Sequence, residues 1–165
     1  MKLYQLRSQQ ILPISKQEAW EFLSNPKNLQ TITPDHMGFD ILSGADRNMF
    51  PGQIIQYKVK PFPMYTTKWV TEITHVVDGS YFVDEQRFGP YALWHHKHFL
   101  EAVEEGVKME DVIDYKLPMG LLGQLAHPIL VKSQLRKIFE YREQKLNALF
   151  GKVEGKETTL ELKTI

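Results

Sequence analysis

The chain has 165 residues, of which 42% are hydrophobic and 24% are charged, and 20 Lys plus Arg balance 20 Asp plus Glu. This length fits one domain, and the balanced charge lacks the basic stripe expected of a protein that binds nucleic acid or anionic lipid. There is no cysteine, which excludes disulfides, thiolate chemistry and cysteine metal sites. We find neither a secretory signal nor an apolar run of about 20 residues that could span a bilayer, and we expect a cytoplasmic protein.

The predicted elements begin with a strand over 2–12. Ser15 then makes a good helix N-cap, with Glu18 three residues later in the pattern of a capping box. A second short helix is predicted over 26–32, and six strands follow, separated by turns rich in Gly, Pro and Asp. These strands are predicted over 38–43, 54–60, 65–77, 80–87, 91–103 and 107–116.

The pattern changes in the last third of the chain. Apolar residues recur there at three- and four-residue steps, which predicts an amphipathic helix over about 125–150 that is irregular at Pro128 and ends at Gly151. The tail 152–165 is either disordered or an added edge strand.

We therefore expect one domain over 1–151, of the α+β class. Its curved antiparallel sheet of about seven strands would wrap around the long helix, with two short helices after the first strand. Such a sheet needs one face covered, and only the long helix has the length to cover it. A cavity between helix and sheet is the expected result.

Three histidines, His95, His96 and His98, fall on the predicted strand 91–103. Histidine is the commonest metal ligand, but side chains alternate along a strand. His96 and His98 therefore share one face, and His95 takes the other. A metal site built from His96 and His98 would need a third ligand from another element, so we expect no metal and no other cofactor.

Asp111 lies among apolar residues on one face of the last predicted strand, whose opposite face is charged, so Asp111 is predicted to point inward. A two-residue turn at either Glu104-Glu105 or Glu105-Gly106 would place this face beside His96 and His98. The predicted inward face of the sheet comprises Trp69, Phe82, Asp84, Gln86, Trp94, His96, His98, Met109, Asp111, Ile113 and Tyr115. The long helix adds Leu135, Ile138, Phe139 and Arg142.

The inward polar groups have three interpretations, because buried carboxylates and imidazoles are costly unless they are paired. His96 and His98 could satisfy Asp84 and Asp111 inside a network that fixes the sheet register. The same groups could line a cavity and bind the polar end of a ligand. A His/Asp pair among them could also perform acid–base catalysis.

Several strings carry a resemblance to a known superfamily. The first is Ala19-Trp20-x-Phe22-Leu23-x-Asn25-Pro26-x-Asn28-Leu29-x-x-Ile32-Thr33-Pro34. The second is Phe82-x-Asp84-x-Gln86-x-x-Gly89-Pro90-Tyr91-x-x-Trp94-x-His96-x-His98. The last are Asp111-x-Ile113-x-Tyr115-x-Leu117-Pro118-x-Gly120-x-x-Gly123 and Ile138-Phe139-x-Tyr141-Arg142. Over about residues 2–150 the chain resembles the START-like, helix-grip superfamily SRPBCC, which includes birch-pollen-type allergens, lipid-transfer START domains and polyketide cyclases, and within it a bacterial ligand-binding subgroup.

The resemblance implies a helix-grip fold that binds or transports a hydrophobic or amphipathic small molecule, such as a lipid, a quinone or a polyketide-like compound. One alternative is a small, cofactor-free polyketide cyclase or dehydratase that uses a pair drawn from His96, His98, Asp84 and Asp111. Another is an interaction domain whose cavity is filled by its own side chains. The resemblance assigns no catalytic residue, and a non-enzymatic role leads. The expected partner is a hydrophobic small molecule, with no nucleic acid and no stable membrane insertion, and the oligomeric state stays open.

Overall fold

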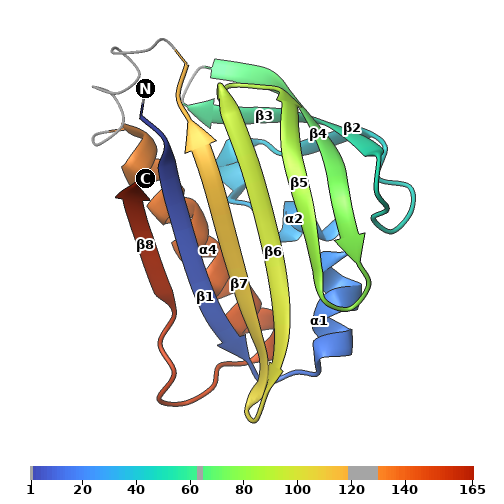
Figure 1. The fold of residues 1–165 in the computed structure, drawn as a ribbon, viewed down its shortest axis with the longest axis vertical. Helices are drawn as coiled ribbons and strands as arrows, with labels where there is room; N and C mark the ends of the chain where they lie inside the picture. The colour runs from blue at the N-terminus through green and yellow to red at the C-terminus, as the bar shows by residue number, and fades with distance from the viewer. Residues whose placement is uncertain (1, 63–64, 119–129) are drawn as a thin grey trace.

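The computed structural model describes residues 2–62, 65–118 and 130–165. The elements in chain order are β1 (Tyr4–Leu12), α1 (Lys16–Leu23), α2 (Asn28–Thr31), η1 (Asp35–Met37), β2 (Asp40–Ser43), β3 (Gln53–Phe62), β4 (Tyr65–Val77), β5 (Tyr81–Phe88), β6 (Leu93–Val103), β7 (Gly106–Lys116), α4 (Lys132–Phe150) and β8 (Thr159–Thr164). The strands form one eight-stranded antiparallel sheet in the order β2-β3-β4-β5-β6-β7-β1-β8 (Figure 1).

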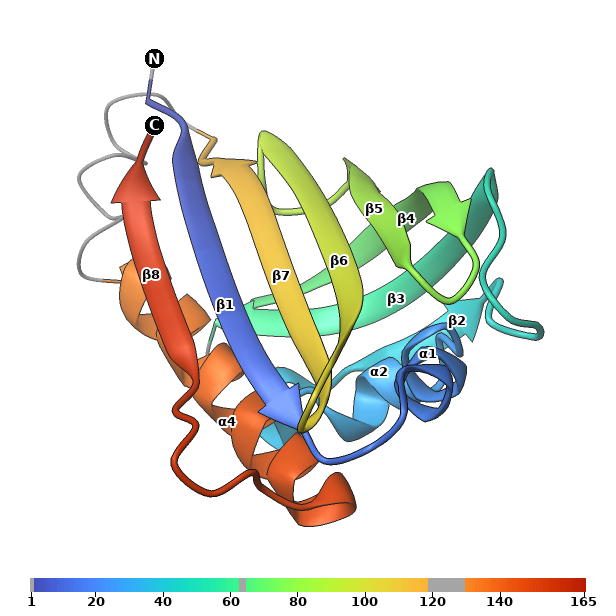
Figure 2. The ribbon, with the colours of Figure 1, turned by 60° about the horizontal axis from the view of Figure 1, so that its bottom comes forward.

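The sheet curves around α4, and α1 and α2 lie beside that helix on the same side of the sheet (Figure 2). One stripe of α4 is buried, formed by Leu135, Phe139, Arg142 and Leu146. Their spacing of three and four residues is that of a single helix face. The predicted α+β class, with a curved antiparallel sheet around a long C-terminal helix, is confirmed.

The ends of the helices follow from local sequence. The Ser15 side chain accepts a hydrogen bond from the backbone N–H of Glu18 at 3.1 Å, which caps α1 as predicted. At the end of α4, Gly151 takes a φ of 92° and its N–H donates to the Asn147 carbonyl at 2.9 Å. The predicted start of this helix near 125 and its irregularity at Pro128 lie outside the described residues.

The sheet has one strand more than expected, because part of the tail forms β8. This strand pairs antiparallel with β1 along the register Tyr4↔Thr164 to Gln9↔Thr159. Leu160 and Leu162 pack against the apolar cluster that contains Tyr115. The tail therefore takes the edge-strand alternative rather than the disordered one.

The register of β6 and β7 follows from the turn that joins them. Val103 pairs with Gly106, so the turn lies at Glu104-Glu105, the first of the two options that the sequence left open. This register sets His98 opposite Asp111. Gly106 has a φ of 139°, and a Cβ there would lie 2.2 Å from a backbone oxygen of β1.

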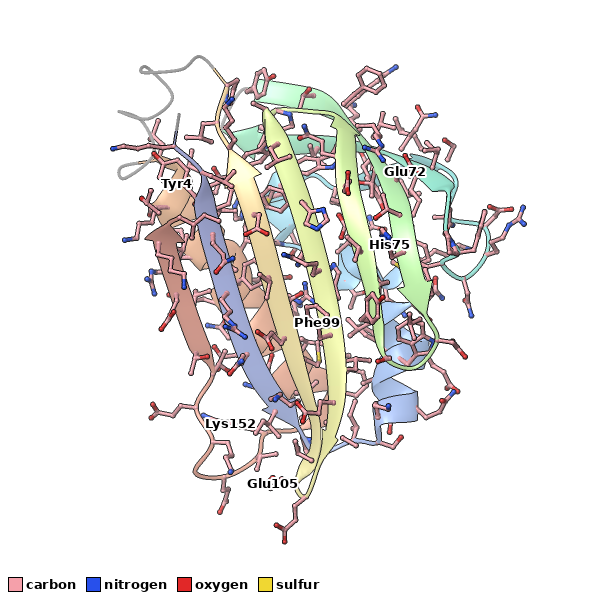
Figure 3. All side chains as sticks on the ribbon, in the orientation of Figure 1. Tyr4, Glu72, His75, Phe99, Glu105 and Lys152 are labelled. Carbon is pink, nitrogen blue, oxygen red and sulfur yellow. The ribbon has the colours of Figure 1, made fainter. Side chains whose placement is uncertain are left out.

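The outer face of the sheet carries the residues that alternation turns away from α4. His95 lies there and contacts Glu85 at 3.0 Å, apart from the other two histidines. An irregularity of register between Ile73 and His75 interrupts the alternation in β4. His75 is exposed beyond it, and Figure 3 labels it on the outer face together with Phe99.

None of the helices in the described ranges combines the length and the apolarity needed to cross a membrane.

Candidate functional site

A cavity of about 180 Å³ lies between α4, the concave face of the sheet and the short helices. Most of its walls are apolar, and side chains from α1, α2, η1, the strands β3 to β7 and α4 contribute to them. An engineered protein cavity of about 150 Å³ binds benzene. The space therefore suits a molecule of one or two rings.

Most of the predicted inward-facing residues, which are the candidate ligand-binding residues, line this cavity. They are Trp69, Phe82, Asp84, Trp94, His96, His98, Ile113, Leu135, Ile138, Phe139 and Arg142. The other four, Gln86, Met109, Asp111 and Tyr115, are not among its lining residues.

Each of these four side chains has another position. Gln86 holds the turn before β6, since its amide donates to the Tyr91 carbonyl at 2.7 Å and accepts from the Tyr91 N–H at 3.1 Å. Met109 and Tyr115 are buried in two apolar clusters. Asp111 is buried in contact with both histidines of the cavity wall. The period-two pattern thus identified the inward face, but not which inward residues reach the cavity.

Sequence reasoning missed several lining residues, among them Phe22, Leu29, Tyr57, Val59, Thr71 and Tyr91. A signal for Tyr57 and Val59 was present, because they alternate with Gln56 and Lys58 along the predicted strand. Alternation along the predicted strand 91–103 would place Tyr91 on the outer face with His95. The strand begins only at Leu93, so alternation does not apply to Tyr91.

Five buried or nearly buried groups form what we call the polar cluster: Asp84 on β5, His96 and His98 on β6, Asp111 on β7, and Arg142 on α4. His96 Nε2 and Asp111 Oδ1 are hydrogen-bonded at 3.0 Å, and His98 Nε2 and Asp84 Oδ2 at 2.9 Å. His96 Nδ1 lies 3.5 Å from Asp84 Oδ2, and His98 Nδ1 lies 2.7 Å from Asp111 Oδ1. Each imidazole is therefore placed between the same two carboxylates.

Aromatic rings hold the two imidazoles in place. The ring centroids of His96 and His98 are 3.7 Å apart, and Phe82 stacks on His98 at 4.1 Å with an interplanar angle of 19°. Trp94 meets His96 edge-on at 6.1 Å. Trp94 also lies 5.3 Å from Trp69 in the cavity wall. The polar cluster thus continues directly into an aromatic lining.

Both carboxyl groups of the polar cluster are held ionised. Burial raises the pKa of Asp111, but the charge of Arg142 and the contacts with both histidines outweigh it and keep the pKa well below its usual value. For Asp84, burial is likewise outweighed, by the hydrogen bond from His98 and by the charge of both imidazoles, and the pKa is lowered.

The two histidines are shifted in opposite directions. Burial and the charge of His98 lower the pKa of His96, although its contacts with the carboxylates oppose this shift. Burial also acts to lower the pKa of His98, but its contacts with Asp111 and Asp84 are stronger and raise it. These directions favour the charged form of His98 over that of His96.

Arg142 is 7% exposed and has few partners for a buried guanidinium. Its Nη2 lies 3.3 Å from Asp111 Oδ1, and its Nε has no hydrogen-bond partner among the described residues. The His98 Nδ1 contact with Asp111, although short, is not aligned as a hydrogen bond. Within the described ranges, Arg142 Nε and His98 Nδ1 are thus buried polar atoms without a hydrogen-bond partner, and both belong to residues of the cavity wall.

A metal site at His96 and His98 needs a third ligand from another element, and the polar cluster contains one. Asp84, on a neighbouring strand, provides the third ligand atom beside His96 and His98, and the three atoms lie within 4.8 Å of one another. The arrangement can therefore hold a cation, move a proton between imidazole and carboxylate, or hydrogen-bond a polar group in the cavity.

The curved sheet, the long C-terminal helix and the cavity between them define a helix-grip fold, and solved structures agree. Protein CV1439 from Chromobacterium violaceum is similar with a TM-score of 0.67 and 14% identity, over 90% of this chain and 99% of that one. TTHA0849 from Thermus thermophilus follows at 0.63 and 13%, over 88% and 98%. Ara h 8.0201, a Bet v 1-like helix-grip protein, is similar at 0.56 and 14%, over 88% and 99%.

At these identities the similarity is one of fold. No protein-family model matches the sequence, and no curated protein matches it.

Proposed function

We propose that the protein binds or carries a hydrophobic or amphipathic small molecule, in the manner of the ligand-binding branch of the START-like SRPBCC superfamily. The observation that carries this proposal is a cavity whose walls are mostly apolar and whose polar groups gather in one buried cluster. Ligand sites in proteins have this composition, with a few placed polar groups that fix orientation.

The dimensions of the cavity narrow the kind of ligand. A volume of about 180 Å³ matches one or two rings better than a whole diacyl lipid. The rings of Trp69, Tyr91 and Trp94 offer flat apolar contacts. We therefore propose a small ring-bearing ligand whose polar group faces His96 and Arg142.

The second candidate function is a cofactor-independent cyclase or dehydratase. The observation in its favour is that His96, whose lowered pKa favours the neutral imidazole, lines the cavity and has Asp84 and Asp111 beside it. A base of this kind could accept a proton from a substrate hydroxyl or from a carbon next to a carbonyl. A cavity filled by its own side chains is the weaker alternative, since space remains between helix and sheet.

Native mass spectrometry of the purified protein, followed by extraction, tests for a ligand that copurifies. Titration with 2-naphthol, a two-ring phenol, tests the cavity directly by fluorescence. Ile138→Trp fills the cavity from α4, and Leu149→Trp is the matched control because Leu149 is exposed on the same helix.

We expect saturable binding of 2-naphthol by the wild type and by Leu149→Trp, and a loss of at least tenfold in affinity for Ile138→Trp. Equal binding by both variants would place the probe outside the cavity. A wild type that binds neither 2-naphthol nor a copurifying molecule would refute the carrier proposal. Consumption of a polyketide-like substrate by the wild type, and its loss in His96→Gln, would favour the second candidate.

A further inference from the structure

The three possible metal ligands are fixed by sheet register rather than by loops. Asp84 on β5 pairs directly with His96 on β6, and His98 follows on the same face of β6. Asp84 Oδ2 lies 2.9 Å from His98 Nε2 and 3.5 Å from His96 Nδ1. Atoms that bind one zinc ion at about 2.0–2.2 Å in a tetrahedral arrangement lie roughly 3.4 Å from one another. The two distances to Asp84 Oδ2 therefore differ from this separation by about half an ångström or less, and the three ligand atoms lie within 4.8 Å of one another.

The other nitrogen of each imidazole faces Asp111. His96 Nε2 and His98 Nδ1 lie 3.0 Å and 2.7 Å from the same oxygen, Asp111 Oδ1. Metal-binding histidines commonly direct their second nitrogen at a carboxylate, which fixes the tautomer and strengthens the ligand. His96 Nδ1 and His98 Nε2 are the nitrogens of the two rings that lie beside Asp84 Oδ2.

A positive centre at the position between Asp84 Oδ2, His96 Nδ1 and His98 Nε2 would be stabilised by all three atoms. Two imidazole lone pairs and a carboxylate oxygen repel one another unless a proton or a metal ion lies between them. A proton on His98 Nε2 satisfies only one of the two imidazoles, and the contact from His96 is the longer one. A metal ion would satisfy all three atoms at once.

We propose that Asp84, His96 and His98 bind one divalent first-row transition-metal ion, with Zn²⁺ as the representative. Two imidazoles and one carboxylate are a common donor set for these ions. All three residues line the cavity, so a further coordination position would face its interior, where water or a ligand atom can bind. This proposal holds whether or not a small-molecule ligand is carried.

Binding of the ion displaces the proton from His98 Nε2 to solvent, so affinity falls as the pH is lowered. Titratable and charged groups face the site from four strands and from α4. They are Asp84 on β5, His96 and His98 on β6, Asp111 on β7, Tyr57 on β3 and Arg142 on α4.

The decisive experiment uses the wild type without a histidine tag, freed of metal with a chelator and titrated with Zn²⁺ under nitrogen-15 NMR. We expect two of the six imidazoles to change, with His96 protonated at Nε2 and His98 at Nδ1. These opposite tautomers follow from the ligating atoms, His96 Nδ1 and His98 Nε2, because the proton then stays on the other nitrogen of each ring. No change in either ring, or changes confined to His95 or other histidines, would overturn the proposal.

Calorimetric titration then tests the carboxylate. Asp84→Asn keeps the shape of the side chain, and we expect its affinity for Zn²⁺ to fall at least roughly tenfold. His95→Gln is the matched control, because it removes the neighbouring histidine from the outer face, and it should bind as the wild type does. A stoichiometry other than one ion per chain, or affinity lost in His95→Gln and kept in Asp84→Asn, would refute the site. The NMR result stands even if Asp84→Asn does not fold.

Discussion

Replacing Asp111 by Asn tests whether the polar cluster depends on one central charge. The substitution preserves shape and removes the charge that contacts Arg142 at 3.3 Å and both imidazoles at 3.0 Å and 2.7 Å. Arg142 would keep its own charge, because a guanidinium does not lose its proton in proteins. Among the described residues, no other carboxylate forms an ion pair with Arg142.

Breaking a buried ion pair from one side costs about 3–5 kcal/mol. Asp111 and Arg142 are 6% and 7% exposed, so solvent screening offers little relief. A domain of this size is usually stable by about 5–15 kcal/mol, and each kcal/mol shifts the melting temperature by about 2–4 °C. We therefore expect Asp111→Asn to lower the melting temperature by about 6–20 °C.

Urea unfolding followed by tryptophan fluorescence and circular dichroism measures this cost. Asp114→Asn is the matched control, because Asp114 lies on the outer face of the same strand and pairs with partly exposed Lys97 at 2.7 Å. It should cost about 1 kcal/mol or less. Arg142→Met should recover part of the loss when combined with Asp111→Asn, with a coupling of about 0.5–3 kcal/mol. A cost for Asp111→Asn no larger than that of the control would refute the central role of this charge.

The other predictions concern pH, the sheet edge and one turn. Because the pKa of Asp111 is lowered on folding, the ionised carboxylate stabilises the fold above about pH 3.9, and this stabilisation declines as the pH falls from there through the pKa of the folded state. Acid unfolding should therefore be less steep in Asp111→Asn. In NMR titrations, His98 should titrate above about pH 6.5 and His96 below it, and the reverse order would contradict the assigned charges. Deletion of β8 should leave the circular dichroism spectrum recognisable and cost about 2–4 kcal/mol, since two half-buried leucines lose their packing; a cost near zero would show that β8 is dispensable. Gly106→Ala should cost about 1–3 kcal/mol in urea, because its φ is 139° and a Cβ meets the backbone of β1, whereas an unchanged midpoint would refute that strain.

The fold could be predicted from the sequence because its strong signals are local. Ser15 and Glu18 cap α1 through atoms three residues apart, and Gly151 ends α4 through its own backbone angle. Alternation along β6 separated His95 from His96 without any tertiary information. The edge strand β8 was less predictable, because a short polar tail becomes a strand only when a partner edge is available to it.

The cavity was harder to predict because its boundary depends on distances across the molecule. Met109 and Tyr115 point inward as alternation requires, but other side chains cover them. Leu29 reaches the cavity from a helix of four residues, whose orientation no periodicity specifies. Tyr91 precedes its strand, so the tertiary contact with Trp69 rather than alternation directs its ring.

The charge of the polar cluster connects the two proposals. When His98 is charged and His96 is neutral, the two positive charges of His98 and Arg142 balance the two negative charges of Asp84 and Asp111. An anionic ligand would then be buried without a counter-charge, which is costly, so the metal-free cavity should prefer a neutral polar group. A divalent ion that displaces one proton leaves the cluster with one additional positive charge.

The preference for ligands should therefore depend on the metal. Without Zn²⁺, 2-naphthol should bind more tightly than naphthalene-2-carboxylate, which has a similar ring system but is negatively charged. With Zn²⁺ bound between Asp84, His96 and His98, the carboxylate should gain affinity relative to the phenol, because its charge is then compensated. The same ratio of affinities with and without metal would mean that the ligand's polar group does not approach the polar cluster. A gain that persists in Asp84→Asn would mean that the metal acts from another position.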